Sequence, residues 1–244
     1  MSNLNNLFNT SGEYSKEITR DFFKNVYMYM FGALAISGII AFMAGTPEFV
    51  FSNFVNYDPV TNTGSPNALF WIVSLAPVGL GLVIQMAYRR LSLGLLMFLF
   101  LGYSALMGLS LSVILVTYSI GTVAITFFVT AGAFGAMAVI GYTTKTDLTK
   151  FGSLMYMLFI GIFISSIINI WVGSEMFDFV ISIVGVFVFT GLTAYFMQQL
   201  KNTAQNEMLD GVERNKLALV GGLVLYILFI NLFMSLLRLM GSND

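Results

Sequence analysis

The stretch LGLLMFLFLGYSALMGLSLSVILV, residues 93–116, decides the fold because it carries no charged residue. Continuous apolar runs of about 18 residues or more are typical of bilayer-spanning helices, since about 20 residues cover the hydrocarbon core. Seven such runs occur, at about residues 26–44, 69–86, 93–116, 122–142, 153–171, 178–198 and 217–239. We therefore predict an all-α membrane protein, a seven-transmembrane-helix bundle over residues 26–240 preceded by a cytoplasmic tail, residues 1–25.

The composition of the whole chain supports this assignment. Hydrophobic residues make up 57% of the sequence and charged residues only 9%, whereas soluble domains average about 45–50% and about 25%. The net charge of −1 gives no reason to expect a nucleic-acid partner. The absence of Cys and His excludes disulfides, zinc sites with Cys or His ligands, and thiol or imidazole catalysis. We expect no cofactor, no metal site and the lipid bilayer as the main partner.

The loops between the runs predict the orientation. If the runs cross the membrane alternately, ten of the eleven Lys and Arg residues fall on one side, including the pair Arg89 and Arg90. Basic residues in short loops remain in the cytoplasm. We therefore expect a cytoplasmic amino terminus, with Arg89 and Arg90 as topology anchors. The acidic residues of its tail also argue against a cleaved signal peptide. The longest connection, residues 45–67, is expected to form extramembrane turns.

Small residues cluster in the fourth run. Ala131 and Gly135 lie four residues apart on one helical face, and Gly132 and Ala136 lie on the adjacent one. Such faces let a neighbouring helix approach closely. We expect this cluster to be a packing surface.

Polar residues align in the fifth and seventh runs. Asn169 follows two serines at helical spacing, and Asn231, Ser235 and Arg238 form one stripe. Such a face either bonds to neighbouring helices or lines a watered cavity, and we favour bonding between helices for the serines and asparagines. Arg238 is close enough to the outer interface to act as an anchor there.

No Asp, Glu, Lys or His stands deep in any of the seven runs. Ion pumps and proton relays usually keep such groups inside the membrane. A retinal protein needs a buried lysine, an intramembrane aspartyl protease needs two buried carboxylates, and a Ser–His hydrolase needs a histidine. The sequence therefore predicts that the protein is not an enzyme.

An ordered set of motifs is similar to the Bax inhibitor-1 family in its bacterial branch. The signature is FGAMAVIGYTTKTDLT, residues 134–149, whose loop carries Tyr142, Lys145 and Asp147. The other motifs are SALMGLS at 104–110, GIFISSIIN at 161–169, FTGLTAY at 189–195, FINLF at 229–233 and LLR at 236–238. The match runs from about the second helix to the carboxyl terminus. By capping chemistry alone, the loop needs only Thr146 or Asp147 to begin the next helix.

The resemblance implies a fold and an activity. It implies a seven-helix bundle with a central last helix, a pH-sensitive calcium leak, and protection against stress-induced death or proteolysis. It also implies a pH sensor, made of two aspartates facing each other on the sixth and seventh helices. Two carboxylates that share a buried site have one raised pKa, which explains such gating.

In this sequence Phe196 and Leu228 stand at the positions of those two aspartates. Removing both carboxylates avoids leaving one buried charge without a partner, so the fold is expected to survive. Phe196 follows Thr193 by three residues and Leu228 precedes Asn231 by three. The two apolar side chains form either a hydrophobic plug that gates by dewetting or part of a sealed bundle.

We therefore predict a multi-pass protein of the bacterial cytoplasmic (inner) membrane that conducts calcium or another cation without the acidic sensor. Asn169, Thr193, Phe196, Leu228, Asn231 and Ser235 are the candidate pore or gate residues. The alternative is a non-conducting regulator that binds other membrane proteins, such as a membrane protease. A seven-helix receptor has less support, because no buried charge offers an anchor for a polar ligand.

Overall fold

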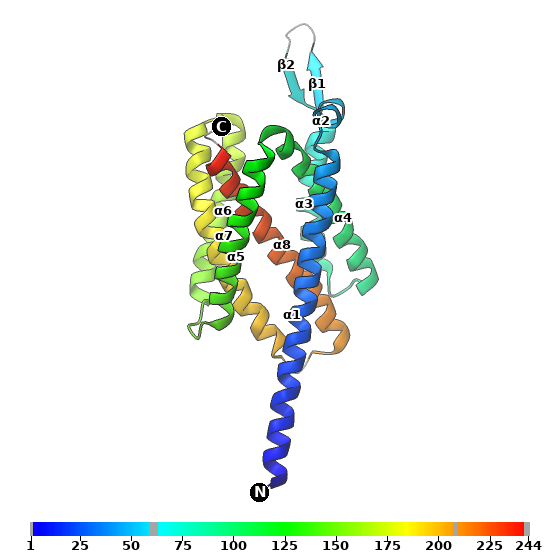
Figure 1. Ribbon diagram of the computed structural model, residues 1–244, viewed down its shortest axis with the longest axis vertical. Helices are drawn as coiled ribbons and strands as arrows, with labels where there is room; N and C mark the ends of the chain where they lie inside the picture. The colour runs from blue at the N-terminus through cyan, green and yellow to red at the C-terminus, as the bar shows by residue number, and fades with distance from the viewer. Residues whose placement is uncertain (1, 59–62, 207–208, 242–244) are drawn as a thin grey trace. The chain divides into compact units, whose positions relative to one another are not determined.

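The computed structural model describes residues 2–58, 63–206 and 209–241, with side chains from Glu17 onward. Its elements, in chain order, are α1 (Ser2–Ala44), α2 (Pro47–Phe54), β1 (Val55–Asp58), β2 (Thr63–Pro66), α3 (Ala68–Ala87), α4 (Leu93–Thr117), α5 (Ile120–Thr143), α6 (Thr149–Val172), α7 (Glu175–Ala204) and α8 (Gly211–Gly241) (Figure 1). Within the described residues, seven helices are long and apolar enough to cross a membrane: α1 from Glu17 on, and α3 to α8. The prediction of seven apolar helices is confirmed.

The helices begin and end at residues whose side chains or conformations fit those positions. Thr46, Asn67, Ser92 and Ser174 each accept a hydrogen bond from a backbone amide in the first turn of the helix that follows. Gly173 ends α6 in the left-handed conformation, with φ of 62°, which a residue without Cβ adopts without strain. Such caps explain why the helices begin beside polar residues rather than at the first apolar one.

One prediction about a connecting segment is wrong. The connection at residues 45–67 holds more than turns, because α2 and the antiparallel pair β1–β2 form within it. Val50 and Phe54 of α2 are buried against Val73 of α3, and this packing stabilises the short helix. Helices α7 and α8 also extend past both ends of their apolar runs, because backbone hydrogen bonding continues wherever no breaker stands.

The chain divides into two compact units. One unit holds residues 22–120 and 209–223, and so includes α1 from Phe22, α2 to α4, and the beginning of α8. In it α3 packs along α4, and the Ser37 hydroxyl of α1 donates to the Ser104 carbonyl of α4 at 2.7 Å. A Cβ at Gly108 would lie only 2.8 Å from the Ser37 carbonyl oxygen, so α1 and α4 are in close contact.

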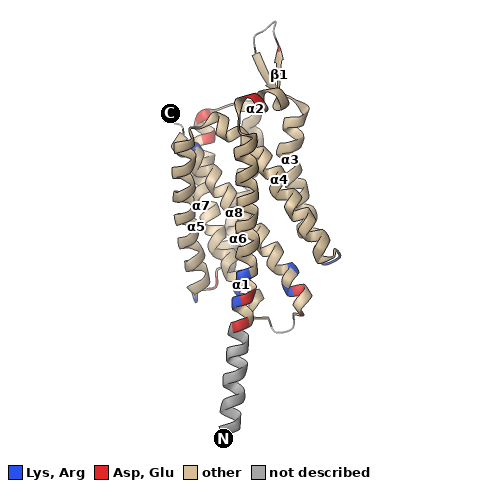
Figure 2. Ribbon diagram, turned by 45° about the vertical axis from the view of Figure 1, so that its right-hand side comes forward, with Lys and Arg blue, Asp and Glu red and all other residues tan. Residues whose placement is uncertain are grey.

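The other unit holds residues 1–21, 121–208 and 224–244, and includes α5, α6, α7 and the end of α8. Helices α6 and α7 pack along each other. Helix α5 turns a row of residues four apart inward: Thr126, Thr130, Phe134 and Ala138 are buried. In Figure 2 the charged residues of α6, α7 and α8 lie at or near the ends of those helices.

The small residues of α5 do not pack as expected. Gly132 and Gly135 are exposed, and a Cβ at either would meet no atom within 4 Å. The close contact lies farther along, where Gly141 meets the backbone of Ala194 on α7. Small apolar residues can face lipid without a desolvation cost. The sequence alone therefore does not show which face of small residues packs against another helix.

Candidate functional site

The Phe196 side chain lies in an aromatic cluster between α6 and α7. Its ring centroid is 5.9 Å from that of Tyr156 and 5.5 Å from that of Tyr195, and the two tyrosines are 6.1 Å apart. All three pairs meet edge to face, the arrangement that aromatic quadrupoles favour. The predicted gate residue therefore packs against Tyr156 of α6 and against Tyr195 of its own helix, α7.

Leu228 on α8 is buried, with 4% of its surface exposed. Helices α7 and α8 are antiparallel in this unit, because the start of α7 meets the end of α8 while Gly185, farther along α7, contacts Ser235. Extended along both helices, this register brings Leu228 level with Leu192, about 6 Å or one turn before Phe196. On that extrapolated register the two positions differ by one turn along the helix pair.

The polar residues near these positions bond within their own helices. The Thr193 hydroxyl donates to the Phe189 carbonyl at 2.7 Å. Asn231 donates through Nδ2 to the Ile227 carbonyl at 2.8 Å, and Ser235 donates to the Asn231 carbonyl at 2.9 Å. In apolar surroundings, a hydroxyl or amide group can donate its hydrogen bond to the carbonyl four residues earlier in the same helix, without any contact to a neighbouring helix. The hydrogen bonds that Thr193, Asn231 and Ser235 donate in this structure therefore lie inside their own helices.

Asn169 does not belong with the other candidates. Its Oδ1 accepts a hydrogen bond from the Ser174 amide at 3.1 Å, so it closes the turn between α6 and α7. Tyr156, which touches Phe196, stands 13 residues earlier on α6, and this spacing separates Asn169 from the aromatic cluster by about 20 Å.

Arg238 has a specific partner at that same end of the unit. Its Nη1 lies 3.3 Å from Oδ1 of Asp178, and the side chains are 39% and 41% exposed. An ion pair with this exposure contributes about 0–1 kcal/mol. The interfacial anchor predicted from the sequence is also a link between α8 and the first turn of α7.

The other predicted anchors belong to the loop between α3 and α4 in the first unit. Arg89 donates through Nε to the Tyr88 hydroxyl at 3.0 Å, and this hydrogen bond raises the pKa of the Arg89 guanidinium. Arg90 is exposed, and its backbone amide donates to the Ala87 carbonyl. Neither arginine enters the apolar part of a helix.

The signature loop between α5 and α6 is held by hydrogen bonds with side chains of α7. Gln198 of α7 accepts from the Leu148 amide through Oε1 and donates to the Thr146 carbonyl through Nε2, each at 2.8 Å. Lys201 donates to the Tyr142 carbonyl at 2.9 Å, with its ammonium 5.2 Å from the centre of the Tyr142 ring. The end of α7 therefore holds both ends of the loop.

Sequence reasoning missed Gln198 and Lys201. They lie three residues apart, hence on one face of α7, at the point where its apolar run gives way to polar residues. That spacing was the available signal. The spacing did not show that this face of α7 binds the loop, which lies about fifty positions earlier in the chain.

Asp147 lies in the loop two residues before Thr149, the first residue of α6. Its Oδ1 accepts from the Thr149 hydroxyl at 2.6 Å and from the Thr149 amide at 2.9 Å. These hydrogen bonds, the hydroxyl first, lower the pKa of the Asp147 carboxyl, and the charge of Lys150 contributes in the same direction. The residue at the N-cap position is Leu148, which makes no side-chain capping bond. Asp147, one position earlier, satisfies the amide of Thr149, the first residue of the helix.

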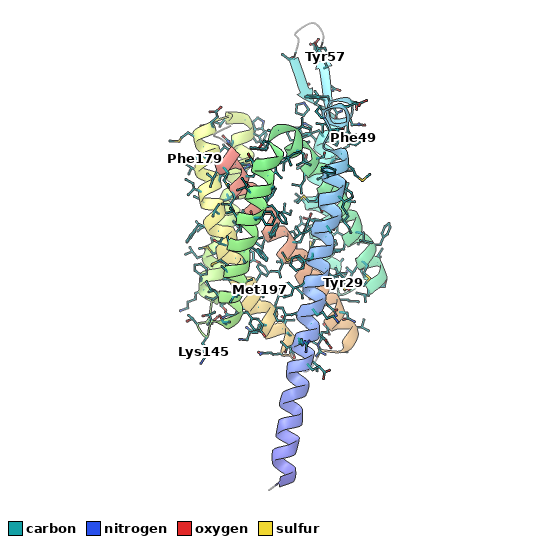
Figure 3. All side chains as sticks on the ribbon, in the orientation of Figure 1. Tyr29, Phe49, Tyr57, Lys145, Phe179 and Met197 are labelled. Carbon is teal, nitrogen blue, oxygen red and sulfur yellow. The ribbon has the colours of Figure 1, made fainter. Side chains whose placement is uncertain are left out.

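A polar pocket of about 240 Å³ opens beside the loop. Its lining combines loop and α7 residues: Thr144, Lys145, Asp147, Gln198, Lys201 and Asn202. Figure 3 shows Lys145 at the loop end of this unit and Phe179 at the other end. Across the described residues no group of three or more His, Cys, Asp or Glu side chains is placed to hold a metal ion.

Comparison with known proteins gives consistent matches along the chain. The profile of the family described as "Inhibitor of apoptosis-promoting Bax1" matches residues 19–244. Inner membrane protein YbhL of Escherichia coli strain K12 is 44% identical over 179 residues, which cover 72% of this chain and 76% of that protein. An uncharacterized protein of Borreliella burgdorferi is 38% identical over 230 residues, 93% of this chain and 94% of that protein. One from Caulobacter vibrioides is 37% identical over 227 residues, covering 92% and 89%.

Proposed function

Because the chain belongs to the Bax inhibitor-1 family of multi-pass membrane proteins, we propose that it is an ion leak protein without the acidic pH sensor. Calcium is the expected ion. The bacterial inner membrane is the proposed location, with the amino terminus in the cytoplasm. The name of the E. coli relative supports the membrane, and the one-sided distribution of basic residues supports the orientation.

The observation that carries the proposal is the environment of the two positions where the family resemblance expects carboxylates. Leu228 is buried and Phe196 is packed against two tyrosine rings. No Asp, Glu or Lys stands between Asp178 and Lys201 in the sequence of α7. An apolar constriction excludes water and ions until the helices move apart, and no group at this level of the pair titrates near neutral pH.

Calcium flux into liposomes tests the proposal. The full chain is reconstituted around an entrapped calcium dye, and flux is measured across a pH series that spans the titration of a buried carboxylate pair. We expect flux above that of empty liposomes, with no pH step. If no pH gives flux above the empty liposomes, the leak is excluded, and a pH step in the unmodified chain contradicts the missing sensor.

Restoring the carboxylates makes the test specific. The double variant Phe196→Asp with Leu228→Asp should introduce a pH step, because two acids on adjacent levels of one helix pair share a proton at low pH and repel when both ionise. The matched control is Phe196→Asn with Leu228→Asn, which adds polarity without a titratable group. A flux that stays independent of pH in the aspartate variant would refute the geometry proposed for the gate.

A second candidate, a non-conducting regulator of other membrane proteins, is favoured by one observation. The small-residue face of α5 at Gly132 and Gly135 is uncovered within the described chain, and such a face suits close approach by a foreign helix. Crosslinking in native membranes, followed by identification of the products, tests this candidate. Recovery of the chain alone argues against it, as does a crosslinked partner that Gly132→Ile fails to release.

A further inference from the structure

The pocket beside the signature loop carries more positive than negative charge. Lys145 and Lys201 contribute two ammonium groups to its lining, and Asp147 contributes the one carboxylate. One oxygen of that carboxylate already accepts two hydrogen bonds from Thr149. The charge balance of the lining therefore favours an anion over a metal cation.

The donors of the pocket are only partly used. Lys201 makes one hydrogen bond, to the Tyr142 carbonyl, and an ammonium group has three protons to donate. Lys145 has no hydrogen-bond or ion-pair partner among the described residues. Several N–H donors are therefore available around one space, an arrangement suited to a group with several acceptor oxygens.

The walls of the pocket are fixed before any ligand arrives. Gln198 bonds to both Thr146 and Leu148, so the loop is held against α7. Asp147 fixes the start of α6 through Thr149. A pre-organised frame lowers the entropy cost of binding, which distinguishes this pocket from a set of mobile surface lysines.

The position of the pocket along α5 identifies the environment of its ligand. The apolar run that ends at Tyr142 is about 30 Å long, which matches the hydrocarbon thickness of a bilayer. Tyr142 is 38% exposed, and tyrosines mark the level where hydrocarbon meets headgroups. The pocket begins two residues later, at Thr144, and so lies at the depth of the lipid phosphates.

We propose that the pocket formed by the α5–α6 loop and the end of α7 binds the phosphate group of an anionic phospholipid. Lys145 and Lys201 pair with the phosphate oxygens, and the Tyr142 ring beneath Lys201 sets the depth. This site is separate from the positions of Phe196 and Leu228 and does not depend on ion conduction. A soluble phosphate presents the same chemistry, and competition by inorganic phosphate distinguishes the two sources.

Lipid binding to the purified full chain tests the site. Native mass spectrometry in a neutral detergent measures retention of phosphatidylglycerol and, for comparison, zwitterionic phosphatidylcholine. We expect a preference for phosphatidylglycerol that Lys145→Gln lowers about fivefold, the usual worth of one lysine at an anionic surface. Lys145 is exposed, so its variant should unfold at the same temperature as the unmodified chain. Lys145→Arg should keep most of the preference.

Lys150→Gln is the matched control, because Lys150 lies in the first turn of α6 but does not line the pocket. Equal losses in Lys145→Gln and Lys150→Gln would overturn the site in favour of general surface attraction, and so would the lack of any preference for phosphatidylglycerol. Tighter calcium binding by Lys145→Gln would overturn it in favour of a cation site. If millimolar inorganic phosphate competes with the lipid, the ligand is a soluble phosphate. If it does not compete, the ligand is the lipid. Both results support a phosphate site.

Discussion

Replacing Gly141 by Ala should push α5 away from α7. A Cβ at this position would overlap the carbonyl oxygen of Ala194 and lie 2.7 Å from both its carbonyl carbon and its Cα. Carbon atoms in favourable contact are about 3.5–4.0 Å apart, so the helices must separate by about 1 Å. The colliding atoms belong to the backbone, and no rotamer change relieves them.

The same substitution at Gly135 provides the reference. Gly135 lies on the same helix, and a Cβ there meets no atom within 4 Å. Alanine favours a helix over glycine by about 1 kcal/mol at either position, so this contribution cancels in the comparison. The remaining difference is the cost of overpacking, about 1–3 kcal/mol. Gly135→Ala should therefore be neutral or stabilising, and Gly141→Ala less stable than it by that amount.

Reversible unfolding in mixed micelles of increasing denaturing detergent measures the two free energies of unfolding. Fluorescence of the two tryptophans, Trp71 and Trp171, and helical circular dichroism both follow the transition. The variant Ala194→Gly should not rescue Gly141→Ala, because the clash involves backbone atoms that glycine also has. Equal stability of the two alanine variants, or full rescue by Ala194→Gly, would refute the close contact between α5 and α7.

Three further predictions concern polar contacts. Gln198→Ala removes two loop hydrogen bonds and should raise hydrogen exchange across the α5–α6 loop about tenfold or more, whereas Gln199→Ala, which loses one bond within α7, should leave the loop unchanged. A double-mutant cycle with Asp178→Asn and Arg238→Gln should give a coupling below about 1 kcal/mol, because both groups are well exposed; a coupling above about 2 kcal/mol would contradict this. Hydrogen bonding lowers the pKa of the Asp147 carboxyl. The stabilisation of the loop by the ionised carboxyl is therefore complete above the pKa of an ordinary aspartate, and it is lost only as the pH falls through the lowered value. Loop protection, corrected for intrinsic exchange rates, should therefore stay constant from neutral pH into that acid range, and Asp147→Asn should abolish the acid step.

The sequence determined the helices because each apolar run must satisfy its own backbone hydrogen bonds in lipid. Seven uncharged runs predict seven membrane-length helices without knowledge of any neighbour. The ordered motifs likewise predicted the Bax inhibitor-1 family, and the family match over residues 19–244 confirms it. The hydrogen bond from the Thr149 amide to Asp147 is equally local, since the two residues are only two positions apart.

Only the tertiary structure decided which faces meet. Small residues at 132, 135 and 141 look alike in the sequence, yet only Gly141 contacts another backbone. Gln198 bonds to a loop 50 residues earlier, and Arg238 pairs with an aspartate 60 residues earlier. Helical spacing says which residues share a face, but in lipid an apolar face is nearly as stable against hydrocarbon as against another helix. The choice of neighbour therefore depends on packing and on a few polar contacts between distant segments, and the contacts of Gln198 shape the loop pocket of this protein.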